Sequence, residues 1–297
     1  MKFLTEKNQL EFQDLHMHTT FCDGKNSPEE MVISAIEKGL KVVGISCHSY
    51  THFTSECCVT PENELFFVQT VNELKKKYAD KIKVLVGIEK DLFTTASCGE
   101  YDYVIGSVHY YKRGDKYNFV DRAKEEFIRS VNELFDGDYY GAVEEYYQNM
   151  ALIVEKTNCD IIGHIDLVTK FNKDFNLFDE THPRYVNAYK KAIDRLLKTG
   201  KPFEINMGAI SRGYRKEPYP SLDILEYIKK NGGLSDARNT GLKYVEGKYE
   251  YDSNASISPA YNSVSTFNAV YSRTVKYYIQ EIYAYIFRLI NIGGATL

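Results

Sequence analysis

Six short apolar runs, separated by longer amphipathic segments, constrain the fold of this chain more than any other feature. The runs cover residues 12–16, 41–46, 83–88, 101–108, 160–163 and 201–206. Helical patterns follow or separate them at residues 27–38, 60–78, 122–135, 140–156, 183–198 and 222–230. Strands that alternate with helices are typical of parallel pairing, so this pattern predicts an α/β fold.

The first predicted helix has the clearest boundary signals. Ser27 is expected to be its N-cap and Pro28 its first residue, and Glu30 would complete a capping box with the serine. Gly39 is expected to end the helix.

Polar residues fall at the C-terminal ends of the predicted strands. They are His16, His18, His48, Glu89, His109, His164 and Asn206. In a closed parallel barrel these strand ends share one face, and that face carries the active site. An open doubly wound sheet would spread them along an edge, so their convergence favours a barrel. The chain has no G-x-G-x-x-G or P-loop motif, which argues against nucleotide-binding folds.

The residue types at these positions predict a metal site. Five of the seven histidines end strands, and Glu89 and Asp23 add carboxylates. Imidazoles and carboxylates suit Zn, Mn or Fe in a hydrolytic site, and the number of ligands suggests more than one ion. For any single histidine the alternative is a hydrogen-bonded loop residue. His182 is interpreted as a helix-entry residue, and His52 as either an exposed loop residue or a substrate contact.

Composition narrows the class of protein. A net charge of -4 and a pI near 6.0 argue against a nucleic-acid groove. No apolar run approaches the roughly 20 residues that span a bilayer, and the first residues lack the apolar stretch of a signal peptide. The six cysteines have no C-x-x-C spacing, which favours reduced thiols and a cytoplasmic location. A thiolate nucleophile at Cys22 or Cys47 is disfavoured because no base partner is evident.

With these residues identified, the sequence resembles the PHP (polymerase and histidinol phosphatase) superfamily, and within it the histidinol-phosphate phosphatases. The matching segments are residues 14–24, 44–48, 87–89, 102–109, 161–166 and 204–206. Residues 208–215 and 219–221 resemble the phosphatase branch rather than the polymerase branch. The resemblance implies a distorted TIM-like (β/α)7 barrel over residues 1–238.

The resemblance also implies a site for three metal ions. His16, His18 and Glu89 would hold the first ion, Glu89 would bridge to a second held by His109 and His164, and Asp23 and His48 would hold the third. Arg212 and Arg215 are the candidates to pair with a substrate phosphate, because a guanidinium fork matches two phosphate oxygens. Asp166 would either orient His164 or protonate the leaving alkoxide.

The family pattern breaks near the end of the chain. It expects a seventh strand that closes with Ser-Asp-x-His, but here Ser235 and Asp236 are followed by Arg238 in the histidine position. The last strand is therefore expected to be short or irregular. Asp236 is taken as the remaining metal ligand; the alternative is Asp252, supplied by a closing strand over residues 248–254. Residues 239–297 are predicted to be an atypical tail, with a linker and a possible helix.

The leading hypothesis is a metal-dependent phosphomonoesterase that hydrolyses L-histidinol phosphate to L-histidinol and phosphate, by a metal-activated hydroxide, in histidine biosynthesis. Two alternatives stay open: a PHP-type phosphoesterase for another small phosphate ester, and a weakened or inactive metal-binding barrel. The expected cofactors are two or three divalent Zn, Mn or Fe ions. The expected partner is a small phosphorylated substrate rather than a nucleic acid or a membrane, and the oligomeric state stays open.

Overall fold

A parallel sheet of seven strands, in the order β1-β2-β3-β4-β7-β8-β9, forms the centre of the structure. The structure is a computed structural model that describes residues 13–95, 99–211, 215, 217–232, 235–236, 242–245 and 248–251. The strands of the sheet are β1 (Gln13–Met17), β2 (Val42–Ile45), β3 (Lys83–Asp91), β4 (Tyr103–Ser107), β7 (Ile161–Ile162), β8 (Phe203–Glu204) and β9 (Ser235–Asp236). Every neighbouring pair is parallel, as the alternation of strands and helices predicted.

The described helices lie close to the predicted ranges, except for three short segments at residues 167–169, 172–175 and 208–211 that were not predicted. They are α1 (Pro28–Glu37), α2 (Pro61–Lys77), α3 (Lys124–Phe135), α4 (Tyr139–Met150), α5 (Ile153–Thr157), the 3-10 helix η2 (Leu167–Thr169), α6 (Asn172–Phe175), α7 (Pro183–Leu197), α8 (Gly208–Ser211) and α9 (Leu222–Lys230). The capping box at the start of α1 is confirmed, since Ser27 and Glu30 each bond the other's backbone N–H. The segment predicted as one helix over residues 140–156 is split into α4 and α5.

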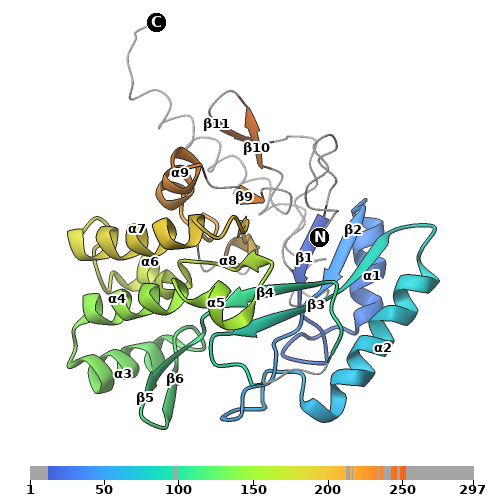
Figure 1. The fold of residues 1–297 in the computed structure, drawn as a ribbon, viewed down its shortest axis with the longest axis horizontal. Helices are drawn as coiled ribbons and strands as arrows, with labels where there is room; N and C mark the ends of the chain where they lie inside the picture. The colour runs from blue at the N-terminus through green and yellow to red at the C-terminus, as the bar shows by residue number, and fades with distance from the viewer. Residues whose placement is uncertain are drawn as a thin grey trace, which may run out of the picture.

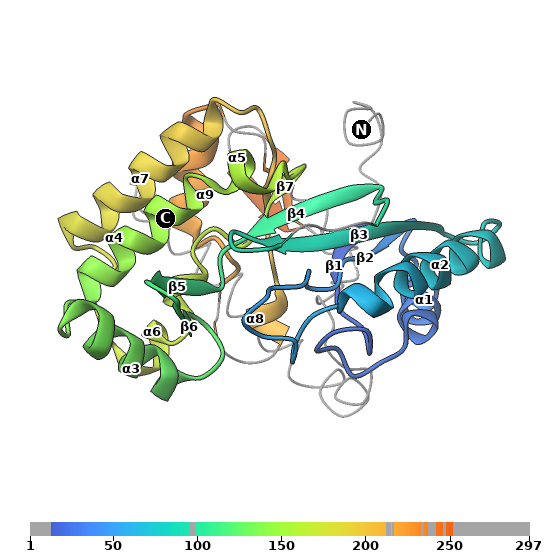
Figure 2. The same ribbon diagram turned by 60° about the horizontal axis from the view of Figure 1, so that its bottom comes forward.

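The sheet curls into a partial barrel, which confirms the distorted TIM-like α/β fold (Figures 1 and 2). The seventh strand is short, as expected, and its Ser235 and Asp236 pair in parallel with Phe203 and Glu204 of β8. Within the described residues no pairing joins β9 back to β1. The alternative closing strand at residues 248–254 is wrong: β11 (Lys248–Tyr251) pairs instead with β10 (Leu242–Val245), in a separate antiparallel sheet.

Helices bury their apolar faces against the outside of the sheet in two groups. α1 and α2 cover β1 to β3, where Phe67, Val71 and Leu74 repeat at helical spacing and are buried. α4, α7 and α9 pack on the other half of the sheet, in a second apolar cluster (Figure 1). None of the helices in the described ranges is long and apolar enough to cross a bilayer.

The interior of the barrel is filled by side chains from several strands. They are Leu15, Val42, Leu85, Tyr103, Ile105 and Ile161. The Tyr103 hydroxyl donates to the Leu15 carbonyl across the interior. A methyl group added at Gly44 or Gly87 would collide with the Tyr103 ring, so the two glycines make room for it.

A β-hairpin that the sequence analysis did not anticipate lies between β4 and α3. It consists of β5 (Tyr110–Arg113) and β6 (Lys116–Phe119), joined by a turn at Gly114 and Asp115. Gly114 has a φ of 56°, in the left-handed region where glycine carries no penalty. A two-residue Gly-Asp loop is a recognised hairpin signal, so this element could have been predicted. The predicted linker and tail helix lie outside the described residues.

Candidate metal centre

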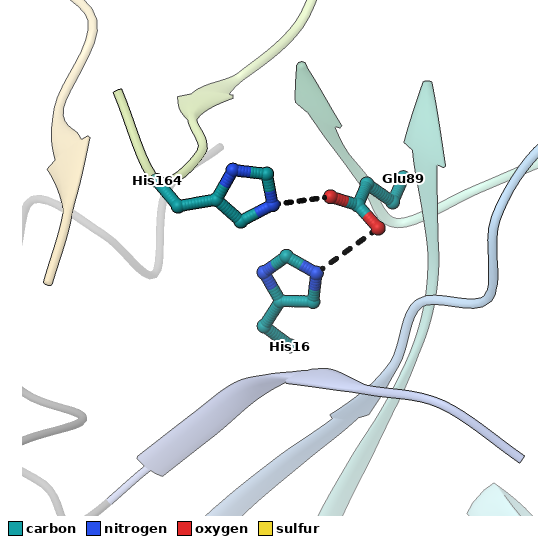
Figure 3. Close-up of side chains that lie close together, drawn as sticks. All are labelled: His16, Glu89 and His164. Atoms are coloured by element: carbon teal, nitrogen blue, oxygen red, sulfur yellow. Dashed lines mark hydrogen bonds and ion pairs between the residues drawn. The ribbon is translucent and has the colours of Figure 1, made fainter. Parts of the chain in front are cut away.

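The ends of the first strands bring the candidate ligands to one place. His16 lies in β1, Glu89 lies in β3, and His164 follows β7 directly. Figure 3 shows these three side chains pointing at one another from separate strands. His48, which follows β2, forms a parallel bridge with Glu89. The parallel register therefore collects side chains that are far apart in the sequence.

Glu89 is the centre of the cluster, and its side chain has no exposed surface. Five imidazole nitrogens lie within 3.5 Å of its carboxylate oxygens: Nε2 of His16 at 3.2 Å, Nε2 of His18 at 3.3 Å, Nδ1 of His48 at 2.9 Å, Nε2 of His109 at 3.5 Å and Nε2 of His164 at 2.9 Å. The prediction that the strand-end histidines converge is thereby confirmed in geometry.

The electrostatics of the cluster follow from this crowding. Burial by itself would raise the pKa of Glu89, but the surrounding imidazoles hold that pKa well below its usual value. Burial would lower the pKa of His16, but Glu204 and Glu89 raise it above the usual range. The buried Oε2 of Glu89 has no hydrogen-bond partner in the structure. A ring of nitrogen lone pairs around a dry carboxylate fits bound cations better than protons.

Asp23 forms the outer side of the same cluster. Its carboxylate lies 2.8 Å from Nδ1 of His18 and 3.9 Å from Nε2 of His48. Burial would raise the pKa of Asp23, but His18 and His48 lower it well below the usual value.

Three groups of side chains have ligand atoms close enough together to hold a metal ion. They are His16 with Glu89 and His164, His18 with Asp23 and His48, and His48 with Glu89 and His109. Within each group the ligand atoms lie within 4.8 Å of one another. Glu89 belongs to two groups, as a bridging ligand would. These groups differ from the expected ligand sets, because His16 is grouped with His164 rather than with His18. Which ligands share which metal ion stays a prediction.

Two buried carboxylates hold the histidines in place. Glu204 accepts a hydrogen bond from Nδ1 of His16 at 2.6 Å and from the backbone N–H of His164 at 2.9 Å. Asp91 accepts from the backbone N–H of His109 at 2.7 Å and lies 3.4 Å from its Nδ1. Such partners orient metal-binding imidazoles. The sequence analysis gave neither a role, although Asp91 faces the same side of β3 as Glu89 by strand periodicity.

Arg215 and Asp166 form a buried pair behind the cluster. Nη1 of Arg215 lies 3.5 Å from Oδ2 of Asp166 and bonds Thr169, and its guanidinium lies 4.4 Å from the centre of the Tyr219 ring. Oδ2 of Asp166 also accepts the Ser221 backbone N–H at 2.9 Å. Burial raises the pKa of Asp166 to about 6, although Arg215 lowers it. Within the described residues Asp166 makes no hydrogen bond to His164, whose ring Nδ1 has no hydrogen-bond partner, and Glu204 bonds His164 at its backbone N–H.

The remaining predicted residues are only partly described. Arg212, Arg238 and Asp252 lie outside the described residues. For Asp236 the structure gives the backbone, which pairs beside Glu204 at the same end of the sheet. His182 accepts from the Arg184 N–H at the start of α7, which confirms its helix-entry role.

The cysteines near the cluster do not resemble nucleophiles. Sγ of Cys22 lies 3.6 Å from Nδ1 of His18, but burial raises the Cys22 pKa well above its usual value. The five described cysteines are free thiols.

A cavity of about 300 Å³ opens on the histidine cluster. Besides the candidate ligands, its lining includes the cationic side chains of Arg122 and Lys170, the carboxylate of Asp121, and the rings of Tyr110 and Phe119. None of these five was identified from the sequence. Neither Arg215 nor Asp166 is part of the lining. The cavity is of a size that holds a small molecule.

Comparison with known proteins places these observations in a family. The model of the PHP domain matches residues 14–208. A protein of Deinococcus radiodurans named "Probable histidinol-phosphatase" is 25% identical over 233 residues, which cover 74% of this chain and 82% of that protein.

Two solved structures resemble the fold. One, from Listeria monocytogenes and described as a "putative histidinol phosphatase", has a TM-score of 0.64 and 21% identity, and the match covers 75% of this chain and 92% of that one. The other is the histidinol phosphate phosphatase of Lactococcus lactis, solved with zinc, L-histidinol and phosphate. It has a TM-score of 0.57 and 21% identity, over 76% of this chain and 84% of that one.

Proposed function

The chain belongs to the PHP domain family, and from this premise we propose that it hydrolyses L-histidinol phosphate to L-histidinol and phosphate with the help of divalent metal ions. It is a phosphoric monoester hydrolase of the histidinol-phosphatase type. The observation that carries the proposal is the buried Glu89 with five imidazole nitrogens within 3.5 Å, in the lining of a cavity that also includes Arg122 and Lys170.

The proposed metal ligands are His16, His18, Asp23, His48, Glu89, His109, His164 and Asp236. When bound, two or three Zn, Mn or Fe ions would supply Lewis acidity and lower the pKa of water. The chain's own contribution is orientation: Glu204 and Asp91 fix the rings of His16 and His109, so that their other nitrogens face Glu89.

Positive charge at the cavity would bind the anionic phosphate. Lys170 and Arg122 line the cavity, and Arg212 is retained as a phosphate ligand by its place in the family pattern. The contacts of Arg215 support a positioning role instead: its side chain is fully buried against Asp166 and Thr169. The burial of Asp166 likewise favours holding the segment at Ser221 over protonating a leaving group.

The substrate and setting rest on the relatives. The Deinococcus radiodurans relative carries the histidinol-phosphatase name, and a cavity of about 300 Å³ suits an ester of that size. The reaction would belong to histidine biosynthesis. The free cysteines support the reducing cytoplasm as its location. The net charge of -4 supports a small phosphorylated partner rather than a nucleic acid.

Phosphate release from L-histidinol phosphate tests the proposal directly. The zinc- or manganese-loaded protein is expected to release phosphate, and a chelator is expected to stop the reaction. Glu89→Gln should lower kcat by more than about 100-fold, beyond the 10–100-fold typical of residues that only support a ligand. Glu125→Gln, on the exposed side of α3, is the matched control and should retain full activity. Release that survives both chelation and Glu89→Gln would contradict the mechanism.

A panel of other small phosphate esters separates the alternatives. Equal turnover of several esters would favour a phosphoesterase of different specificity. Full metal occupancy with no turnover of any ester would favour an inactive metal-binding barrel.

A further inference from the structure

The acidic residues that line the cavity are not equivalent. They are Asp23, Glu89, Asp91 and Asp121. Three of them contact the histidine cluster: Asp23 at His18, Glu89 at five imidazoles, and Asp91 at His109. Asp121 makes its described contacts with Lys170 instead. Among the four lining carboxylates, Asp121 is therefore the one with no hydrogen bond or ion pair to the histidine cluster in the described residues.

Asp121 and Lys170 present opposite charges side by side. Nζ of Lys170 donates to the Asp121 carbonyl at 2.6 Å and to its Oδ2 at 3.1 Å. Burial would raise the Asp121 pKa, but Lys170 and His109 lower it to about 2, so the carboxylate is ionised at neutral pH. Such a pair matches a ligand that carries an anion at one end and a cation at the other.

Aromatic rings form the wall beside Asp121. Tyr110 and Phe119 are cross-strand neighbours in the β5–β6 hairpin, with ring centres 4.7 Å apart, and both line the cavity. Phe53, from the loop after β2, contacts Tyr110 at 4.8 Å and stacks on Tyr117 at 3.7 Å and 6°. These contacts fix the wall in one arrangement. The hairpin that carries it, β5–β6, lies beside α3 in Figure 1.

The wall is coupled directly to the candidate metal site. Tyr110 follows His109 in the chain, and the Val120 N–H donates to the His109 carbonyl at 2.8 Å. Rings at this position would face the part of a phosphate ester that points away from the metals. Flat rings favour another flat ring through stacking or edge contact.

We propose that Asp121, with the paired rings of Tyr110 and Phe119, forms the subsite for the alcohol part of the substrate and selects alcohols that carry a protonated amine beside a flat ring. This inference rests on the proposed phosphatase function, because that function places the phosphate at the metals and the alcohol against the hairpin. The Asp121 carboxylate binds the ammonium group, and the rings of Tyr110 and Phe119 contact the planar group.

Binding of the alcohol, measured without turnover, tests this subsite separately from the activity. The probes are L-histidinol, 3-(imidazol-4-yl)propan-1-ol, which lacks only the amine, and 2-aminopropan-1-ol, which lacks the ring. Each is titrated by ligand-observed NMR into the zinc-loaded, full-length protein with inorganic phosphate present. L-histidinol should bind about 10- to 100-fold more tightly than the amine-free alcohol, as expected for a charge-assisted hydrogen bond.

Two variants should separate the contributions of charge and ring. Asp121→Asn should reduce the preference for the amine to within about threefold, because the shape is kept and the charge is lost. Phe119→Leu should weaken both imidazole alcohols by about 2- to 10-fold without changing the preference for the amine, and should leave 2-aminopropan-1-ol unaffected. Asp115→Asn, at the exposed turn of the same hairpin, removes an equal charge away from the cavity and should change nothing.

Several results would overturn the subsite. The first is a wild-type protein that binds the amine-free alcohol as tightly as L-histidinol. The second is an unchanged preference in Asp121→Asn, and the third is an equal loss in Asp115→Asn. If Asp121→Asn does not fold, Asp121→Ser replaces it: this variant also removes the carboxylate, and an unchanged preference for the amine in it would count against Asp121. A protein that shows the binding preference but releases no phosphate would refute the phosphatase function and leave the subsite standing.

Discussion

Glu204→Gln tests whether the histidines near Glu89 are held ready for metal by a buried carboxylate. Glu204 contacts two candidate ligands, at 2.6 Å from Nδ1 of His16 and 2.9 Å from the His164 N–H. Glutamine keeps the side-chain shape and one acceptor oxygen but removes the charge. Loss of such support typically weakens metal binding by about 10–100-fold, which corresponds to about 1.4–2.8 kcal/mol. Because Glu204 supports two histidines, we expect the upper half of that range.

The zinc dissociation constant, measured by competition with a chromogenic chelator, is the readout. Glu64→Gln is the matched control, because Glu64 is a buried glutamate of α2 that bonds Tyr101 and the Gly99 N–H away from the cavity. That variant should keep the zinc affinity of the original protein. An affinity of Glu204→Gln within twofold of the original, with the fold intact by circular dichroism, would refute the reasoning.

Three further predictions follow from the same geometry. Arg215→Met should lower the free energy of unfolding by about 3–5 kcal/mol because it leaves a buried carboxylate unpaired; a large loss of kcat with unchanged stability in urea would instead support direct phosphate contact. Gly87→Ala should cost about 1–3 kcal/mol in a thermal melt through its collision with Tyr103, and Tyr103→Leu in the same chain should relieve the collision. Burial would lower the pKa of His109, but nearby carboxylates raise it to about 9 in the metal-free protein. Zinc must therefore displace that proton, so zinc affinity should rise as the pH increases towards about 9, with proton release on binding detected by calorimetry in two buffers; an affinity independent of pH would contradict this assignment.

The strand ends were predictable because their signals are local. A short apolar run that stops at a histidine gives both the strand and the direction of its end, and four such runs imply a shared face once the sheet is parallel. The capping residues Ser27 and Glu30 are three apart, so their pairing could also be predicted.

The support behind the ligands depends on contacts between distant residues. Glu204 meets His16 across 188 residues of sequence, and only the curl of the sheet brings the two together. The partners of Arg215 were also hidden, because an arginine in a loop resembles a phosphate ligand until its burial against Asp166 is known. Lys170 had no motif of its own, and its role depends on the hairpin that brings Asp121 beside it.

Tyr103, which spans the barrel interior, also limits the direction from which a ligand can reach the histidines. Tyr103 lies two residues before Ile105, which pairs with Glu89, and its ring fills the barrel interior with the other residues of that apolar cluster. Under the proposed function, the substrate and both products are expected to pass through the part of the cavity that Tyr110 and Phe119 line. The alcohol, which is proposed to bind beside the hairpin, should leave the cavity first, and the phosphate at the metal site should leave last.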